Sequence, residues 1–180
     1  PAKYEQHGSA LATVRAGNVI GGGDWALDRV VPDILRAFER SIPVIIRNPH
    51  AIRPWQHVLE PLSGYLLLAQ KMYSEGTQFG EGWNFGPNDT DATPVQNIVE
   101  KMVSFWGKDA SWQLDGSEHP HEAHYLKLDC SKAKMQLGWH PRWSLDTTLA
   151  RIVAWHQAWL SDSDMRDYSI NEINSYMNTK

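Results

Sequence analysis

The fold class is decided by the stretch Ala10-Leu11-Ala12-Thr13-Val14-Arg15-Ala16 and by the glycine-rich residues that follow it, Gly17-Asn18-Val19-Ile20-Gly21-Gly22-Gly23. The run over 10–15 is short, largely apolar and without a polar face, which is typical of a strand that is buried on both sides. The glycines predict a loop at its carboxyl end. Such strands form the parallel sheets of α/β proteins, whose ligands bind at the carboxyl ends of the strands. The stretch therefore predicts an α/β fold.

Hydrophobic periodicity predicts helices and short strands along the rest of the chain. Apolar residues three, four and seven positions apart predict helices over 31–38, 62–73, 95–106 and 145–160, with Asp28 and Ser144 as candidate caps of the first and last. Short strands are predicted at 44–46, 56–59, 82–86, 112–114 and 125–128, and a short helix is predicted to end at Leu137. The polar residues 161–180 are expected to form a loose helix or a frayed end. One compact unit is the simplest interpretation.

The composition excludes several classes of protein. The 180 residues are 42% hydrophobic and 21% charged, which is far from the composition of a disordered chain. A formal net charge of -4 argues against binding to nucleic acid or to anionic membrane surfaces. No apolar run approaches the roughly 20 residues that cross a bilayer. Because the single cysteine, Cys130, can form no internal disulfide, we expect a reducing compartment, the cytoplasm. The favoured partner is a small molecule or a protein.

The histidines of the segment 118–124 suggest a metal site, which we consider but do not adopt. His119, His121 and His124 resemble the HxHxDH signature of metallo-hydrolases, but Ala123 stands where that signature has aspartate. The alternatives are a solvated loop and a loop that contacts a ligand. We therefore predict no metal.

Glycines and arginines offer two possible phosphate contacts. Residues 21–25 match neither GxGxxG nor a Walker motif, so the glycines serve either a turn alone or a tight ligand-binding loop. Arg29, Arg47 and Arg53 lie near the ends of successive elements, and their planar guanidinium groups could converge on a diphosphate. The alternative is that they are scattered surface arginines.

Tyr176 and Lys180 have the YxxxK spacing of short-chain dehydrogenases, but we interpret the match as chance. In that chemistry the lysine lies one helical turn from the tyrosine on a rigid helix and lowers its pKa. Here the lysine is the last residue of an expected loose or frayed segment.

Seven motifs occur in an order that points to a known family. They are Arg15-Ala16-Gly17-Asn18-Val19-Ile20-Gly21, Arg29-Val30-Val31-Pro32, Val44-Ile45-Ile46-Arg47, Arg53-Pro54-Trp55-Gln56-His57-Val58, Trp83-Asn84-Phe85-Gly86, Asp129-Cys130-Ser131-Lys132 and Leu137-Gly138-Trp139-His140-Pro141. Together they resemble the carboxyl-terminal half of extended short-chain dehydrogenase/reductase proteins that act on nucleotide sugars. The motifs are most similar to those of the dehydratases whose substrate is CDP-glucose.

The resemblance implies a fold and a division of the chain. The expected fold is the later part of an NAD(P)-binding Rossmann-like parallel sheet plus a small mixed α/β substrate-binding lobe. Late Rossmann strands are expected at about 10–20 and 54–86, interleaved with the substrate-binding lobe at about 21–53 and 87–160, and residues 161–180 form a polar tail. The implied cofactor is NAD, and the implied partner is a nucleotide sugar. A homo-oligomer is also implied, because such proteins pair subunits through helices like the one over 62–73.

The resemblance also implies roles for individual residues. The backbone of Ala16 and Gly17 is expected to pass the nicotinamide. Asn18 would face the sugar diphosphate, and Arg29 and Val30 would reach the diphosphate. Val44 and Ile46 match the strand against which the base lies, with Arg47 at its end. Arg53 matches an arginine that pairs with a substrate phosphate, and His121 with Glu122 falls where relatives touch the ribose.

The dinucleotide loop, the YxxxK pair and the acidic residue that drives loss of water all precede the matching region in the resembled proteins. We therefore expect the chain to be a carboxyl-terminal portion that lacks catalytic residues and is inactive alone. Two alternatives stay open: a non-catalytic nucleotide-sugar-binding module, and a nucleotide-sugar 4-epimerase or a dehydratase for another base.

Overall fold

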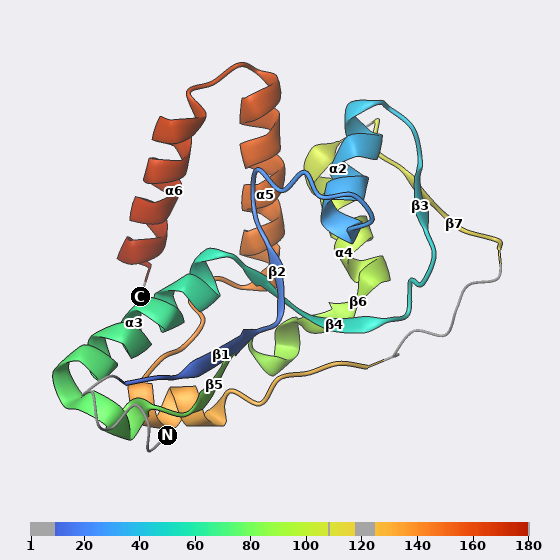
Figure 1. Ribbon diagram of the computed structural model, residues 1–180. Coiled ribbons are helices and arrows are strands. Elements are labelled where there is room, and N and C mark those ends of the chain that lie inside the picture. The colour runs from blue at the N-terminus through green and yellow to red at the C-terminus, as the bar shows by residue number, and fades with distance from the viewer. Residues whose placement is uncertain (1–9, 108, 118–124, 180) are drawn as a thin grey trace.

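The computed structural model describes residues 10–107, 109–117 and 125–179. Its strands form three small sheets with helices packed around them (Figure 1). The strands are β1 (Thr13–Ala16), β2 (Asn18–Ile20), β3 (Val44–Ile46), β4 (Ile52–His57), β5 (Gly82–Phe85), β6 (Ala92–Pro94) and β7 (Trp112–Leu114). The α-helices are α2 (Val30–Glu39), α3 (Leu59–Glu75), α4 (Val95–Trp106), α5 (Leu145–Leu160) and α6 (Met165–Asn178). Shorter helical turns are η1 (Gly76–Phe79), η2 (Asp89–Asp91) and the π-helical η3 (Ala133–Leu137).

Three of the four strand pairs are parallel, which confirms the predicted α/β class. β1 pairs with β5, β2 with β4 and β3 with β7, all in parallel, while β6 runs antiparallel to β4. Parallel pairs need crossover connections, and α2 lies in the connection between the parallel strands β2 and β4.

The helices predicted at 31–38, 95–106 and 145–160 bury most of their apolar residues. The helix predicted at 62–73 forms as part of α3, but its apolar face is not buried, since Leu62, Leu66 and Tyr73 are exposed. Val95, Ile98, Val99 and Met102 of α4 are buried in a core shared with α2, α5 and β3. A second apolar cluster contains Trp83 and Phe85 of β5, Leu68 of α3 and residues of the 130–139 segment. The side chain of Gln56 in β4 donates a hydrogen bond of 2.8 Å to the carbonyl of Phe85 in β5. This contact joins the sheet of β2, β4 and β6 to the sheet of β1 and β5.

The prediction that the strand over 10–15 is buried on both sides is wrong. Thr13, Val14 and Arg15 are exposed, and 58% of Leu11 is accessible. The reason is topological: within the described residues β1 has a neighbouring strand on one edge only, namely β5. The apolar side chains of a strand are suited to burial, but they are buried only where neighbouring strands or helices cover them.

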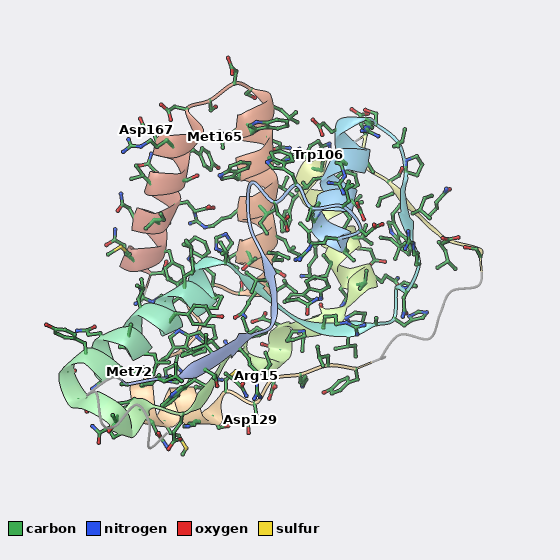
Figure 2. The ribbon with its side chains drawn as sticks, in the orientation of Figure 1. Arg15, Met72, Trp106, Asp129, Met165 and Asp167 are labelled. Carbon is green, nitrogen blue, oxygen red and sulfur yellow. The ribbon has the colours of Figure 1, made fainter. Side chains whose placement is uncertain are left out.

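Of the two alternatives for 161–180, a loose helix or a frayed end, the helix is the one observed: most of this segment is the 14-residue α6, which begins at Met165 (Figure 2). Its cap is Asp164, whose side chain accepts hydrogen bonds from the backbone of Arg166 and Asp167. The helix lies beside α5 (Figure 1) and is joined to it by Trp155, whose indole N–H donates to Ser169 at 3.1 Å.

Smaller differences concern caps and strand limits. Ser144 caps α5 as predicted, by accepting a hydrogen bond from the backbone of Thr147. Asp28 does not cap α2, because Arg29 is the cap residue and Asp28 itself has a left-handed φ of 57°. The strand predicted at 125–128 is reduced to a single bridge between Tyr125 and Ile52. Among the described residues, no helix is long and apolar enough to cross a membrane.

Candidate nucleotide-binding site

Two adjoining cavities lie between the amino-terminal end of α2, the strands β2 and β4, and β3. The first has a volume of about 210 Å³ and the second about 490 Å³. Both are lined by Asn18, Asp28, Val30 and Trp55, so they form two parts of one groove. Asn18 and Trp55 face each other in the register of β2 and β4.

A close backbone approach places Asn18 in the groove. Gly17 joins β1 to β2 and passes so near β4 that a Cβ atom at this position would lie 2.3 Å from the carbonyl oxygen of Pro54. No ordinary side chain tolerates that contact, so only glycine lets the chain make this bend. Gly17 itself lines the larger cavity together with Arg29.

The smaller cavity combines an apolar wall with two cations. Val44 and Ile46 of β3 are buried and line it, as do Arg47 at the end of β3 and Arg53 on β4. The guanidinium of Arg47 lies 4.0 Å from Oδ1 of Asp28, while Nη1 of Arg53 donates to the carbonyl of Ile52 at 2.9 Å. The surface is therefore suited to a ligand with one flat apolar part and one anionic part.

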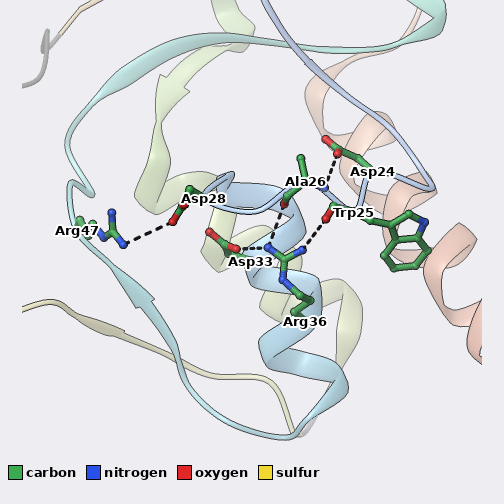
Figure 3. A network of polar contacts seen from close by, with 7 residues as sticks. All are labelled: Asp24, Trp25, Ala26, Asp28, Asp33, Arg36 and Arg47. Atoms are coloured by element: carbon green, nitrogen blue, oxygen red, sulfur yellow. Dashed lines mark hydrogen bonds and ion pairs between the residues drawn. The ribbon is translucent and has the colours of Figure 1, made fainter.

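A network of polar contacts holds the loop before α2 (Figure 3). The Asp24 carboxylate accepts a hydrogen bond of 3.0 Å from the backbone of Ala26. The Arg36 guanidinium donates to the carbonyls of Trp25 at 3.3 Å and Ala26 at 3.1 Å, and it also pairs with the carboxylate of Asp33. Because Arg36 bridges the loop and the helix, it fixes the edge of the groove.

Most residues predicted for the site lie around this groove. The larger cavity is lined by Gly17, Asn18, Arg29 and Val30, and the smaller one by Asn18, Val30, Val44, Ile46, Arg47 and Arg53. Ala16 ends β1 next to Gly17 and lines neither cavity. His121 and Glu122 lie outside the described residues, as does the whole histidine segment 118–124. The binding roles of all these residues stay predictions.

Other lining residues were not predicted as site residues. Trp55, Asn48, Asp28 and Asp33 line the smaller cavity. Trp55 lies inside the Arg53-to-Val58 motif, which could have identified it. Asp33 gives no such signal, since an acidic residue in the first turn of a helix has an ordinary explanation in the helix dipole.

Two other sequence features have structural roles. Gly22 packs against the indole of Trp155, where an added Cβ would lie 2.3 Å from the ring, and the triplet Gly21 to Gly23 lines neither cavity. The hydroxyl of Tyr176 bonds to Glu60 and Ser63, and none of these three residues lines either cavity. Within the described ranges, no three histidine, cysteine or acidic residues gather as metal ligands.

The described lining of the groove offers charge, hydrogen bonds and apolar surface. This described lining contains amide, carboxylate, guanidinium and apolar side chains but no histidine, cysteine, serine, lysine or tyrosine. Among the described groups with a shifted pKa is His57, which lies beside the groove strand β4 but is buried; burial and, to a lesser extent, the Arg151 charge lower its pKa to about 4. The described residues therefore present charge and hydrogen bonds without a nucleophile beside a base.

Comparisons with known proteins agree with the resemblance found in the sequence. No model of a known protein family matches the chain. The chain is 70% identical over 177 residues to CDP-glucose 4,6-dehydratase of Salmonella typhimurium. That match covers 98% of this chain and 49% of the relative, so the chain spans about half the length of the relative. The predicted resemblance to CDP-glucose 4,6-dehydratase is confirmed.

Solved structures confirm the Rossmann-like fold. A point mutant of UDP-glucuronic acid 4-epimerase from Bacillus cereus, in complex with UDP-4-deoxy-4-fluoro-glucuronic acid and NAD, matches with a TM-score of 0.72 at 18% identity. This match covers 88% of the chain and 48% of the epimerase. dTDP-glucose 4,6-dehydratase of Bacillus anthracis, in complex with NAD, has a TM-score of 0.68 at 18% identity, with 87% of this chain and 47% of that chain covered.

Proposed function

We propose that this chain supplies the nucleotide-sugar-binding half of a CDP-glucose 4,6-dehydratase. The observation that carries the proposal is the groove itself: Arg47 and Arg53 come from different strands to one cavity whose wall is Val44 and Ile46. Such a surface suits a diphosphate next to a planar base. The 70% identity to the Salmonella enzyme supplies the choice of substrate, CDP-glucose.

The charges in the groove suggest which residues bind which part of the nucleotide sugar. The cations Arg47 and Arg53 would bind the diphosphate, with Arg29 and the backbone of Val30 reaching it from the larger cavity. The apolar wall of β3 would hold the base. Asn18 lines both cavities, so its amide is placed to hydrogen-bond the sugar diphosphate.

NAD is the proposed cofactor, and it would supply the hydride acceptor and donor of a dehydration that oxidises C4, removes water across C5 and C6, and reduces C6. The described residues fit a small part of such a cofactor, because Gly17 brings an unhindered backbone to the wall of the larger cavity at the carboxyl end of β1. Ala16 and Gly17 would pass the nicotinamide. No catalytic residue is assigned in this chain.

The free edge of β1 supports the view that the chain works as one half of a larger sheet. Val14 and Leu11 are 40% and 58% exposed, and β1 pairs only with β5 among the described residues. A strand edge without a partner presents unpaired backbone N–H and C=O groups, which proteins usually pair or cover. The match covers only about half of the Salmonella relative. We infer that a strand from the other half of the enzyme pairs with this edge.

The exposed side of α3 supports the proposal of a homo-oligomer. Leu62, Leu66 and Tyr73 are 44%, 73% and 95% exposed on this helix. Apolar side chains at such spacing are typical of a helix that packs against another helix.

Calorimetric titration of the chain with CDP, UDP, GDP and dTDP tests the binding function. We expect CDP to bind most tightly and cytidine, which lacks the phosphates, to bind much more weakly. Equal affinity for the four nucleotides would contradict the choice of base. Affinity for cytidine equal to that for CDP would contradict the role of the arginines.

A complementation assay tests the half-enzyme proposal. The chain alone, with CDP-glucose and NAD, should give no dehydration product. Addition of the separately produced amino-terminal half of the Salmonella enzyme should restore turnover. Dehydration by the chain alone would refute the proposal.

A further inference from the structure

The side chain of Asp33 has one oxygen committed and one available. Asp33 lies in the first turn of α2 and lines the smaller cavity together with Val44 and Ile46. Its Oδ1 is paired with Arg36, whereas its Oδ2 has no hydrogen-bond partner anywhere in the part of the chain that the structure describes. The side chain is 45% exposed, so a ligand in the cavity can reach the available oxygen.

The carboxylate of Asp33 is held in place by Arg36, which is itself held by other contacts. Arg36 is only 22% exposed and is itself anchored by the carbonyls of Trp25 and Ala26 (Figure 3). The carboxylate is therefore fixed on a helix by a partner whose own position is fixed. Side chains arranged in this way can discriminate between ligands, because little freedom is lost when the hydrogen bond forms.

The negative charge of the Asp33 carboxylate restricts which part of the ligand can lie beside its available oxygen. The proposed ligand is a dianionic nucleotide sugar, and a carboxylate near its phosphates would be repelled. Arg47 and Arg53 already mark the part of the cavity that suits phosphate. The available oxygen of Asp33 must therefore meet a hydrogen-bond donor on the ligand.

Cytosine carries such a donor. Its exocyclic N4 amine donates hydrogen bonds, whereas uracil and thymine present the O4 acceptor at the same position, and a carboxylate is the side chain that accepts from this amine. A base that lies on the apolar wall of Val44 and Ile46 shares the cavity with Asp33. We propose that the Asp33 carboxylate accepts a hydrogen bond from the cytosine amine and so selects CDP-sugars over UDP-sugars and dTDP-sugars. This inference rests on the proposed function.

Asp28 also lines this cavity but suits the role less well. Its side chain is 85% exposed, lies on the loop before α2 and faces the guanidinium of Arg47 at 4.0 Å. A carboxylate next to a phosphate-binding cation is placed at the anionic end of the ligand. Asp33, by contrast, pairs with Arg36, which lines neither cavity, and no ion pair joins it to Arg47 or Arg53 among the described residues.

Titration of the chain and its variants with CDP and UDP tests the role. The wild-type chain should prefer CDP. In Asp33→Asn, the affinity for CDP should fall about tenfold to a hundredfold, the range expected for a hydrogen bond to a charged group. The affinity for UDP should rise, because the new amide N–H can donate to O4 of uracil. In Asp33→Ala, whose side chain can neither donate nor accept a hydrogen bond, the affinity for CDP should fall without a gain for UDP.

Asp146→Asn is the matched control. Asp146 also lies in the first turn of a helix, α5, and pairs with a cation, Lys101, but it lines neither cavity. This variant should bind CDP and UDP as the wild type does. Far-ultraviolet circular dichroism would confirm that each variant is folded, and if Asp33→Asn is not, Asp33→Ala carries the test.

The outcomes separate the inference from the proposed function. An equal loss of CDP and UDP affinity in both Asp33 variants, or no loss in either, would overturn the inference and leave the proposed function standing. If the wild-type chain binds neither nucleotide, the proposed function fails and the inference fails with it.

Discussion

The hydroxyl of Tyr176 in α6 donates a hydrogen bond of 2.7 Å to Oε2 of Glu60 in α3, a residue 116 positions earlier in the chain. Glu60 is 1% exposed, and its two oxygens also accept hydrogen bonds from the backbone N–H groups of Arg142 and Trp143. One buried carboxylate thus joins α3, the segment before α5 and the end of α6. A buried charge is tolerated only when its acceptors are satisfied in this way.

The first prediction concerns this contact. Tyr176→Phe should lower the free energy of unfolding by about 1–3 kcal/mol, because Glu60 loses a donor in a buried place. Urea denaturation would measure the loss. Tyr73→Phe is the control, since Tyr73 is 95% exposed and the change should have little effect. Equal stability of the two variants would show that the Tyr176 contact does not matter. CDP affinity should be unchanged in both.

Helices that pack through apolar side chains were easier to predict from the sequence than α6, which is attached through polar contacts such as that between Tyr176 and Glu60. The helices at 95–106 and 145–160 were predictable because their apolar residues repeat at the helical period and are buried on one face. The helix α6 was predicted only as a loose helix or a frayed end, because polar atoms attach it: Tyr176 contacts Glu60, and Ser175 accepts from Arg151 at 2.7 Å. Such contacts join residues that are distant in sequence and leave no periodic pattern.

The candidate site was predictable to a similar extent. The positions of Arg47 and Arg53 at the ends of successive elements made a shared site one of two interpretations, the family resemblance favoured it, and both residues line the smaller cavity. Asp33 was missed because its position in a helical first turn already explains an acidic residue. Likewise, the exposure of Val14 depends on the neighbours of β1, which its own sequence does not specify.

The second prediction is a pH dependence of stability that arises from His57. Its Nδ1 accepts from the backbone of Leu59 at 3.3 Å, its Nε2 lies 3.9 Å from Glu172, and burial lowers its pKa from 6.5 to about 4. Between these values the unfolded chain binds the proton and the folded chain does not, so His57 lowers stability as pH falls from 6.5 towards 4. The full effect is on the order of 3 kcal/mol.

Urea denaturation at pH 7, 6 and 5 would measure this dependence. His57→Gln should make the stability less sensitive to pH over this range, whereas His140→Gln, at an exposed position, should leave the dependence unchanged. The comparison with the wild type is needed because buried carboxyls such as Glu172, whose pKa is raised by burial, act in the opposite direction. An identical pH profile for wild type and His57→Gln would contradict the assignment.

The third prediction concerns the bend at Gly17. Gly17→Ala places a methyl group 2.3 Å from the carbonyl oxygen of Pro54, so β2 must move away from β4. We expect a loss of about 1–3 kcal/mol in the free energy of unfolding, as for other overpacked sites. CDP affinity should fall too, because Asn18 moves with Gly17. Gly116→Ala is the control, since no atom lies within 4 Å of the added carbon. A fully stable Gly17→Ala chain would contradict the prediction.

The fourth prediction separates phosphate binding from base binding. Arg53 lines the smaller cavity, and Arg53→Gln removes its positive charge while it retains hydrogen-bonding capacity. CDP affinity should fall about tenfold to a hundredfold, since a charge-assisted hydrogen bond to phosphate is lost. Affinity for cytidine should not change, because cytidine has no phosphate. Arg166→Gln, at an 83% exposed position on α6, should alter neither. If Arg53→Gln weakened cytidine and CDP by the same factor, Arg53 would contact the nucleoside instead of the diphosphate.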